Sequence, residues 1–132
     1  MTLEELLNKY PKIFKPYKGN PRGCNWSCPT GWLNILDWLC GCMQEYIDTH
    51  ESHSKDGVYK PEQVECLQVK EKFAGLRFYT SGHDSNIEGM IKFAEYLCWN
   101  TCQLCGTMEN VKLRGDRWMW TLCETCYEKT KK

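Results

Sequence analysis

Four cysteines near the C-terminus have the type and spacing of ligands for a metal ion. Cys102 and Cys105 form one Cys-x2-Cys pair, Cys123 and Cys126 form a second, and seventeen residues separate the two pairs. Two thiolates on such a tight turn reach one ion at about 2.3 Å, and two pairs complete a tetrahedron. Soft sulfur ligands favour zinc. Because four cysteines close the coordination shell, we predict one structural Zn²⁺ that holds this module folded.

The remaining cysteines give a weaker metal pattern. Cys24 and Cys28 have a Cys-x3-Cys spacing, whereas Cys40 and Cys42 lie two residues apart in a predicted helix. Side chains two apart on a helix point to nearly opposite sides, so these two do not easily ligate one ion. A second metal site from these four residues stays an open alternative. The favoured interpretation places Cys40 and Cys66 in the core as small apolar side chains.

The three histidines do not form a recognisable catalytic set. His50 and His53 lie near the end of a predicted helix, where the helix dipole favours histidine, and His83 lies in a loop. The sequence has no evident nucleophile with its base, no Gly-rich phosphate loop and no HExxH pattern. We therefore expect a non-enzymatic protein, and a hydrolase that uses His83 or His50 stays an alternative.

Basic residues alternate with apolar ones in the stretch QVKEKFAGLRFYTSG and form the candidate ligand site. The alternation predicts two strands around a turn at Ala74-Gly75. If Leu67, Val69 and Phe73 face the core, the opposite face is basic and could hold phosphate groups. The alternative is a solvated face whose lysines prevent edge pairing of the sheet. The candidate ligand-binding residues are Lys70, Lys72, Arg77, Tyr79, Trp32 and His83.

Aromatic and basic residues of the cysteine module offer a second candidate surface. Trp118 and Trp120 alternate onto one face of a predicted hairpin, close to Arg114 and Arg117. Core packing explains such tryptophans, and the alternative is an exposed surface on which nucleic-acid bases stack. The alternative would make the chain a nucleic-acid-binding zinc protein, with the lysines of residues 129–132 as further contacts.

The elements that must position these residues follow from hydrophobic periodicity and from capping residues. Thr2 with Glu5, and Ser85 with Glu88, have the spacing of capping boxes at two helix starts. Gly115-Asp116 is expected to form the turn of the hairpin between the two cysteine pairs. The predicted helices span 2–11, 30–50, 86–100 and 127–132, and the predicted strands span 64–73, 76–80, 111–114 and 118–122.

These elements predict an α+β fold in which helices pack on a small antiparallel sheet. Residues 1–100 form the α+β domain, of which 1–23 are an N-terminal helix and arm. Residues 101–132 form the four-cysteine module. Its order of knuckle, hairpin and helix start is that of a treble-clef or zinc-ribbon module, which we expect to pack on the first domain as one unit.

Composition excludes some partners and leaves others open. Of the 132 residues, 42% are hydrophobic, which is enough for a core, and 17 basic residues balance 17 acidic ones. A net charge of zero gives no bulk attraction to nucleic acid, although a local basic patch stays compatible with it. The sequence has no apolar run of about 18 residues, so we expect no membrane contact and a cytosolic protein. Ten cysteines in a reducing compartment indicate metal binding and free thiols, not disulfides.

Several motifs together resemble a set of small, largely uncharacterised proteins encoded by tailed bacteriophages. They are CPTGW before the long helix, VKEKFAGLRFYTSG, CQLCG and TLCETC, and they run from about Cys28 to Cys126. The chain departs from this pattern in the extra Cys24, Cys42 and Cys66, and in a polar insertion around residues 50 to 57.

The resemblance implies a phage accessory protein in the cytoplasm of a bacterial host. It is expected to counter host defence by binding, either as a sponge for a nucleotide second messenger or as an inhibitor of a host defence protein. Binding of nucleic acid is the first alternative and nucleotide hydrolysis is the second. The sequence leaves self-association into a homo-oligomer open.

Overall fold

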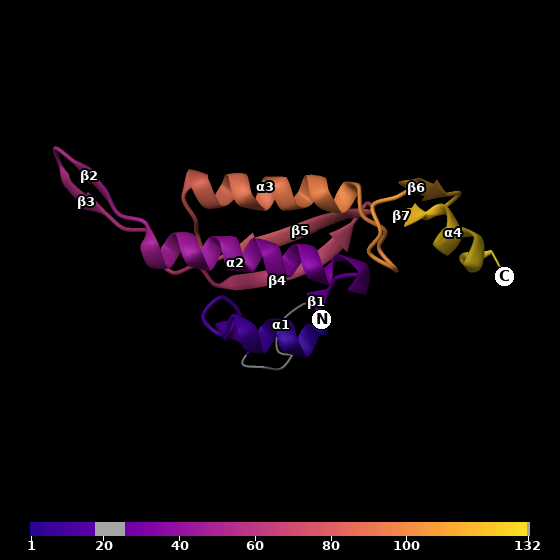
Figure 1. Cartoon of the computed structure of the whole chain (residues 1–132), viewed down its shortest axis with the longest axis horizontal. Helices are drawn as coiled ribbons and strands as arrows, with labels where there is room; N and C mark the ends of the chain where they lie inside the picture. The colour runs from indigo at the N-terminus through magenta and orange to yellow at the C-terminus, as the bar shows by residue number, and fades with distance from the viewer. Residues whose placement is uncertain (18–25, 132) are drawn as a thin grey trace.

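The computed structural model describes residues 1–17 and 26–131, and within them it confirms a mixed α+β architecture (Figure 1). The helices are α1 (Leu3–Lys9), η1 (Lys15–Tyr17), η3 (Thr30–Trp32), α2 (Leu33–Thr49), α3 (Ser85–Trp99) and α4 (Glu124–Thr130). The strands are β1 (Trp26–Ser27), β2 (Ser52–Ser54), β3 (Gly57–Tyr59), β4 (Cys66–Lys72), β5 (Gly75–Thr80), β6 (Val111–Gly115) and β7 (Met119–Cys123). They form one three-stranded sheet, β1-β4-β5, and two hairpins, β2-β3 and β6-β7.

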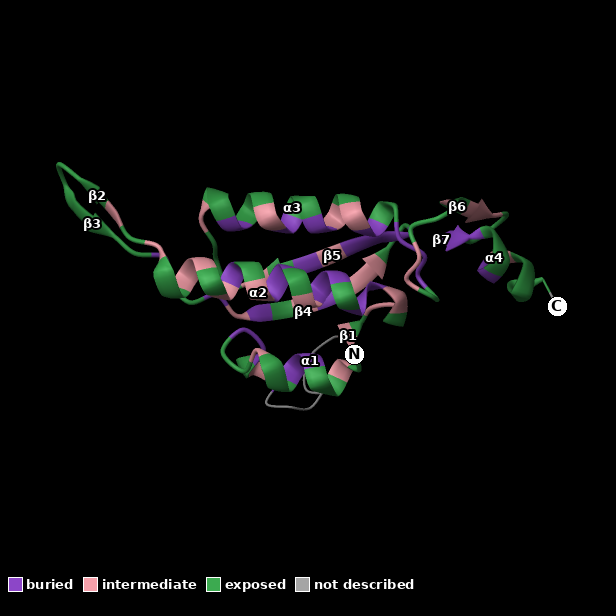
Figure 2. Cartoon of the chain, in the orientation of Figure 1, coloured by how far each residue is buried: buried purple, intermediate pink, exposed green. Residues whose placement is uncertain are grey.

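Helices α2 and α3 cover one side of the three-stranded sheet, and their inward faces supply about half of the buried core (Figure 2). The predicted antiparallel pairing holds for β4 and β5, but β1 adds a short parallel pairing that the sequence did not predict. Thr2 and Glu5 form the predicted capping box of α1. The predicted cap of α3 is wrong by one residue: Asp84 is the N-cap, and its Oδ1 accepts the N–H of Ile87 at 2.9 Å.

The β4-β5 hairpin differs from the prediction at both ends. Its turn is Phe73-Ala74, where both residues have positive φ (53° and 65°), and not Ala74-Gly75. Phe73 therefore points into solvent and not into the core. At the other end, a register irregularity between Cys66 and Gln68 turns Leu67 outward and buries Cys66. A β-bulge of this kind shifts alternation by one residue, which is why a strict period of two placed Leu67 on the wrong face.

The polar insertion that follows α2 forms the β2-β3 ribbon. The ribbon extends beyond the end of α2 (Figure 1). At its base, the hydroxyls of Tyr46 and Tyr59 both donate to Asp84 Oδ2 at 2.5 Å. These bonds join the last turns of α2, the ribbon and the start of α3.

Hydrogen bonds between segments far apart in the sequence join the C-terminal module to the rest of the molecule. The Gly31 N–H donates to the Gln103 carbonyl at 2.8 Å. The Trp32 Nε1–H donates to the Thr101 carbonyl at 2.9 Å, and the Thr121 hydroxyl donates to the carbonyl of Ala74 at 2.8 Å. The two side-chain bonds are buried, so their loss would leave unpaired polar groups in the interior.

Candidate metal centre and the adjoining groove

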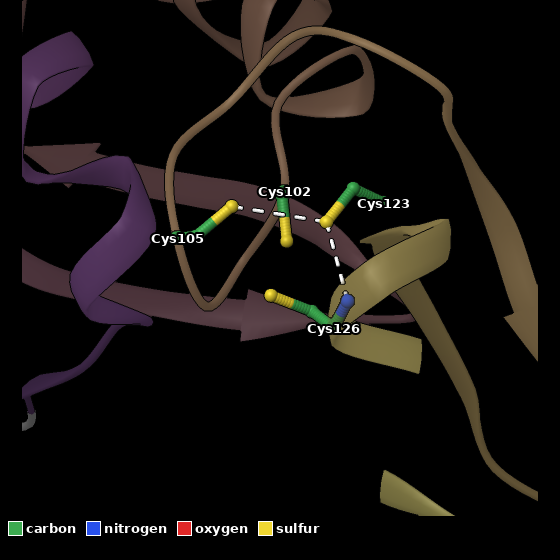
Figure 3. Close-up of side chains that lie close together, drawn as sticks. All are labelled: Cys102, Cys105, Cys123 and Cys126. Atoms are coloured by element: carbon green, nitrogen blue, oxygen red, sulfur yellow. Dashed lines mark hydrogen bonds between the residues drawn. The ribbon is translucent and has the colours of Figure 1, made fainter. Parts of the chain in front are cut away.

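The four predicted metal ligands converge from two segments of the chain (Figure 3). Cys102 and Cys105 lie on a turn that follows α3. Cys123 ends β7 and is the N-cap of α4, and Cys126 lies in the first turn of that helix. The β6-β7 hairpin between the pairs returns the chain so that the second pair faces the first. The structure thus brings all four predicted ligands together.

The sulfur atoms have the separations that a tetrahedral ion requires. All four ligand atoms lie within 4.8 Å of one another, and the Cys105 and Cys123 Sγ atoms are 3.8 Å apart. A tetrahedron with metal–sulfur bonds of about 2.3 Å has edges of about 3.8 Å. The cluster therefore fits one ion in a closed shell of four cysteines and is consistent with a structural metal.

Backbone N–H groups around the cluster favour thiolate sulfur. Gly106, at φ 81°, closes the turn by donating its N–H to the Cys102 carbonyl at 3.0 Å. The Cys126 N–H points at Cys123 Sγ at 3.4 Å. Burial raises the pKa of the Cys102 thiol, but N–H groups of Cys105, Cys123 and Leu104 outweigh it and lower the pKa to about 6. Such donors stabilise a thiolate ready to bind a cation.

The fourth thiol shows what it costs to hold four thiolates close together. Burial, and then the nearby sulfurs of Cys123, Cys102 and Cys105, raise the pKa of Cys126 to about 12. Four thiolates this close would repel one another strongly without a counter-charge. A divalent metal ion removes this penalty, because it attracts all four thiolates at once.

The remaining described cysteines form no second metal cluster within residues 1–17 and 26–131. Cys40 and Cys66 are fully buried in the core, as predicted, whereas Cys42 is exposed on the other side of α2. Burial raises the pKa of the Cys28 thiol to about 12, so this cysteine behaves as a neutral thiol. Cys24, which the prediction of a second site also used, lies outside the described residues.

The predicted basic hairpin residues share the outer face of β4 and β5. Lys70 pairs directly with Arg77 in the register, and Lys72 and Tyr79 lie two residues further along their strands. The Lys70 ammonium lies 5.9 Å from the centre of the Tyr79 ring. One guanidinium nitrogen of Arg77 donates to the backbone carbonyl of the preceding residue, Leu76, at 3.0 Å. Lys72 ends β4 beside the turn, and its ammonium lies 5.6 Å from the centre of the Phe73 ring.

Two of the predicted ligand residues do not belong to this face. Trp32 is fully buried and bonded through its indole N–H, so its side chain is not accessible for the ligand contact predicted from the sequence. His83 lies past the end of β5 that is farther from the hairpin turn, and its Nδ1 is 2.8 Å from the Thr80 hydroxyl. His50, the alternative catalytic histidine, stacks on Tyr46 and contacts Ser52 at 2.8 Å. The structure therefore does not gather the histidines and the basic hairpin face into one site.

The structure instead forms a groove between the tip of the β4-β5 hairpin and the β6-β7 hairpin. The groove has a volume of about 640 Å³. Two exposed aromatic side chains, Phe73 (78% exposed) and Trp118 (64%), line it together with two cations. Its lining residues are Glu71, Lys72, Phe73, Leu113, Arg117, Trp118 and Met119.

The groove combines residues of the two surfaces that the sequence predicted separately. Lys72 comes from the basic hairpin and Arg117 from the cysteine module, whereas Phe73 was predicted to be in the core. Arg114, the other predicted arginine, is occupied elsewhere: its guanidinium donates to the carbonyls of Leu122 and Asn110, both at 2.9 Å. It lies over the ring of Tyr127, with 5.8 Å from the guanidinium carbon to the ring centre.

Comparisons with protein-family models, with curated proteins and with solved structures give no match to this chain. Among the helices within residues 1–17 and 26–131, none has the length and apolar character needed to span a membrane.

Proposed function

We propose that this protein binds, without converting it, a nucleotide-like ligand in the groove between Phe73 and Trp118. A nucleotide combines a flat aromatic base with phosphate, and the groove offers the two matching kinds of contact. Exposed aromatic rings stack on bases of any sequence, and nearby cations attract phosphate. The expected sponge for a nucleotide second messenger is a function of this kind.

The conformation of Phe73 is the observation that carries the proposal. A bulky side chain at positive φ is uncommon, and such a conformation costs about 1–3 kcal/mol. Phe73 also exposes 78% of its surface, so its ring contributes little to the core. Strained residues and exposed aromatic groups cluster at binding sites. The hairpin turn and the packing of Gly75 account for the positive φ. They do not require a large aromatic side chain at this exposed position, whereas a role in ligand contact does.

The charges of the groove favour an anion next to the rings. Within the described residues, neither Lys72 nor Arg117 has a carboxylate within ion-pair distance. Glu71 is the one acid among the lining residues, and its Oε2 accepts the Ala74 N–H at 2.7 Å. Lys72 and Arg117 can therefore contact phosphate while the rings hold a base.

Zinc is the ion we propose for the four-cysteine cluster. Closed sulfur coordination favours Zn²⁺, and the order of turn, hairpin and helix supports a treble-clef-like module. In this proposal the metal has a structural role and fixes the wall of the groove that carries Trp118. The setting in a phage that counters host defence stays a prediction from sequence resemblance.

A second hollow supports single-stranded nucleic acid as the alternative ligand. This hollow has a volume of about 390 Å³ and shares Glu71 and Trp118 with the groove. Trp26 and Trp120 add further aromatic surface to it. A second base could thus stack on the other side of Trp118, as in proteins that bind single strands. Steep salt dependence of binding to oligonucleotides would favour this alternative.

We expect Trp118→Ala to weaken ligand binding by about tenfold or more, because loss of one stacking contact costs about 1–3 kcal/mol. The measurement is thermal shift and calorimetry against mono-, di- and cyclic dinucleotides, short DNA and RNA strands, and inorganic phosphate. Lys72→Glu with Arg117→Glu should abolish binding of the phosphorylated ligands. Trp38→Ala is the matched control, because Trp38 is a similarly exposed tryptophan on α2, outside the groove.

Two results would contradict the assignment. If no nucleotide or strand stabilises the protein, the proposed function fails. If charge reversal of Lys70 and Arg77 removes binding while reversal of Lys72 and Arg117 does not, the ligand occupies the outer face of the β4-β5 hairpin. Zinc content and circular dichroism of each variant show whether the fold has been retained.

A further inference from the structure

A second groove lies between α2 and α3, away from the proposed nucleotide site. Its volume is about 290 Å³, and side chains of the two helices line it. Apart from the thiol of Cys42, these side chains are hydrocarbon, aromatic or thioether. The lining residues are Ile35, Trp38, Leu39, Cys42, Met90, Phe93, Ala94 and Leu97.

The two helices contribute to this groove in the same pattern. Each supplies four residues at positions i, i+3, i+4 and i+7, starting from Ile35 on α2 and from Met90 on α3. Such residues form one stripe along a helix. The helices run antiparallel, since Tyr46 near the end of α2 contacts Asp84 and Asn86 at the start of α3. The groove is therefore a straight trough, about two helical turns long.

Large apolar side chains along the trough are exposed. Trp38 is 59% exposed, Phe93 65% and Tyr96, three residues beyond Phe93, 69%. Met90 and Leu97 pack against the core and are only partly buried. A stripe of exposed aromatic groups over an apolar trough is typical of a protein–protein contact.

Gly89 adds an independent observation on the same stripe of α3. It lies one turn before Phe93, is exposed, and a Cβ at this position would meet no atom within 4 Å. Glycine inside a helix is destabilising relative to alanine. No contact within the described chain therefore accounts for it. A flat position beside the trough lets another backbone approach closely, as small residues do where helices pack tightly.

We propose that this trough binds an amphipathic helix of a partner protein. The end of the partner helix that lies beside Glu45 carries a basic residue. A helix fits between two antiparallel helices and presents apolar residues at i, i+3, i+4 and i+7. Glu45 continues the exposed stripe of α2, three residues after Cys42, and Asp48 follows at the end of the helix. Neither has an ion-pair partner among the described residues, so a cation of the partner would pair with them.

A second copy of this chain fits the same surface less well. A symmetric dimer would press this patch against itself. The patch contains the carboxylates of Glu45 and Asp48. Its nearby cation is Lys92, beside Phe93, and the Lys92 ammonium already forms an ion pair with Glu88 at 3.9 Å. Carboxylates buried without a counter-charge weaken an interface. The charge pattern thus favours a basic partner over self-association.

The test uses three synthetic helical peptides as probes. The first carries leucine and phenylalanine at i, i+3, i+4 and i+7 with two lysines at one end, the second has glutamates in place of the lysines, and the third is scrambled. We expect the lysine peptide to bind best by fluorescence anisotropy and to slow alkylation of the exposed Cys42 thiol, followed by peptide mass spectrometry. Trp38→Ala should weaken this binding by about tenfold or more.

Two further variants separate docking from folding. Glu45→Lys should reverse the preference from the lysine peptide to the glutamate peptide. Gly89→Ala should raise the melting temperature by about 3 °C and yet weaken the peptide complex. A pure stability effect would not produce opposite changes in these two measurements.

Three outcomes would overturn the proposal. One is equal affinity for the lysine and scrambled peptides. Another is indifference of binding to Trp38→Ala and Glu45→Lys. The last is a concentration-dependent dimer, seen by sedimentation, that Trp38→Ala dissociates, since this would place a second copy in the trough. Nucleotide binding is measured in parallel, and its failure would leave the peptide result standing because Trp38 and Trp118 belong to different surfaces.

Discussion

Removing the metal ion is expected to unfold the C-terminal module and to abolish ligand binding in the Phe73–Trp118 groove. Purified protein should contain about one zinc ion per chain, and structural zinc in small modules supplies about 10–16 kcal/mol of apparent binding free energy. The small core of this module is built largely from the ligands themselves, with Cys102, Cys123 and Cys126 packed around Leu122. Without the ion, too little apolar surface is left to keep the segment folded.

A chain of buried hydrogen bonds links the metal centre to the groove. Gln103 lies between the ligands Cys102 and Cys105 and forms two hydrogen bonds with Thr121. Its backbone N–H donates to the Thr121 carbonyl at 2.9 Å, and its side-chain Oε1 accepts the Thr121 N–H at 2.7 Å. Thr121 in turn donates its hydroxyl to the carbonyl of Ala74, next to Phe73. Loss of the metal therefore removes the support of both walls of the groove.

The measurement is elemental analysis and amide hydrogen exchange before and after treatment with a strong chelator. Exchange should rise first in residues 101–131, while α2 and α3 stay protected. Cys123→Ser should reproduce the effect, and Cys42→Ser is the matched control because Cys42 is exposed and outside the cluster. Thr121→Val should retain the metal but weaken ligand binding, since it leaves the Ala74 carbonyl buried without its donor. Full ligand affinity in metal-free protein would refute the coupling.

The four-cysteine cluster could be predicted from sequence because the geometry of each cysteine pair is local. Two residues between paired cysteines set a tight turn, and this turn by itself brings two sulfurs to one ion. The groove could not be predicted in this way. Lys72 and Phe73 reach Trp118 only through folding of segments more than 40 residues apart, and no spacing rule encodes that approach.

The turn of the β4-β5 hairpin shows a second reason for the difference. A turn with two positive φ values normally carries glycine or asparagine, so the FAG sequence predicts that Gly75 lies in it. In the structure, Gly75 instead begins β5, and a Cβ there would come within 2.7 Å of the Trp99 ring. The glycine serves packing against α3, and Phe73 and Ala74 take the strained positions. Tertiary contact thus overrides the local preference.

Gly31→Ala is expected to be among the most destabilising single substitutions in the chain. A Cβ at this position would lie 2.2 Å from the Cys102 carbonyl oxygen and 2.6 Å from the carbonyl of Gln103. These are backbone atoms of the metal-binding turn, so they cannot move aside as a flexible side chain would. The cost of overpacking is about 3 kcal/mol, which corresponds to a fall in melting temperature of roughly 10 °C.

The reason for glycine at this position is space and not backbone conformation. Gly31 has an ordinary φ, but its N–H bonds to Gln103, and its carbonyl oxygen would lie 3.0 Å from a Cβ at Gly106. The start of η3 and the metal-binding turn therefore pack backbone against backbone. Displacing one must displace the other, so Gly31→Ala should also speed the transfer of metal to a chromogenic chelator.

Gly89→Ala is the matched comparison, because it makes the same chemical change in a helix where the added methyl group meets nothing within 4 Å. The two variants should shift the melting temperature in opposite directions, and only Gly31→Ala should accelerate metal release. If Gly31→Ala lowered stability but left metal release unchanged, the contact would matter for the start of α2 alone. Equal effects of the two variants would show that helix propensity, and not the close approach to Cys102, governs both positions.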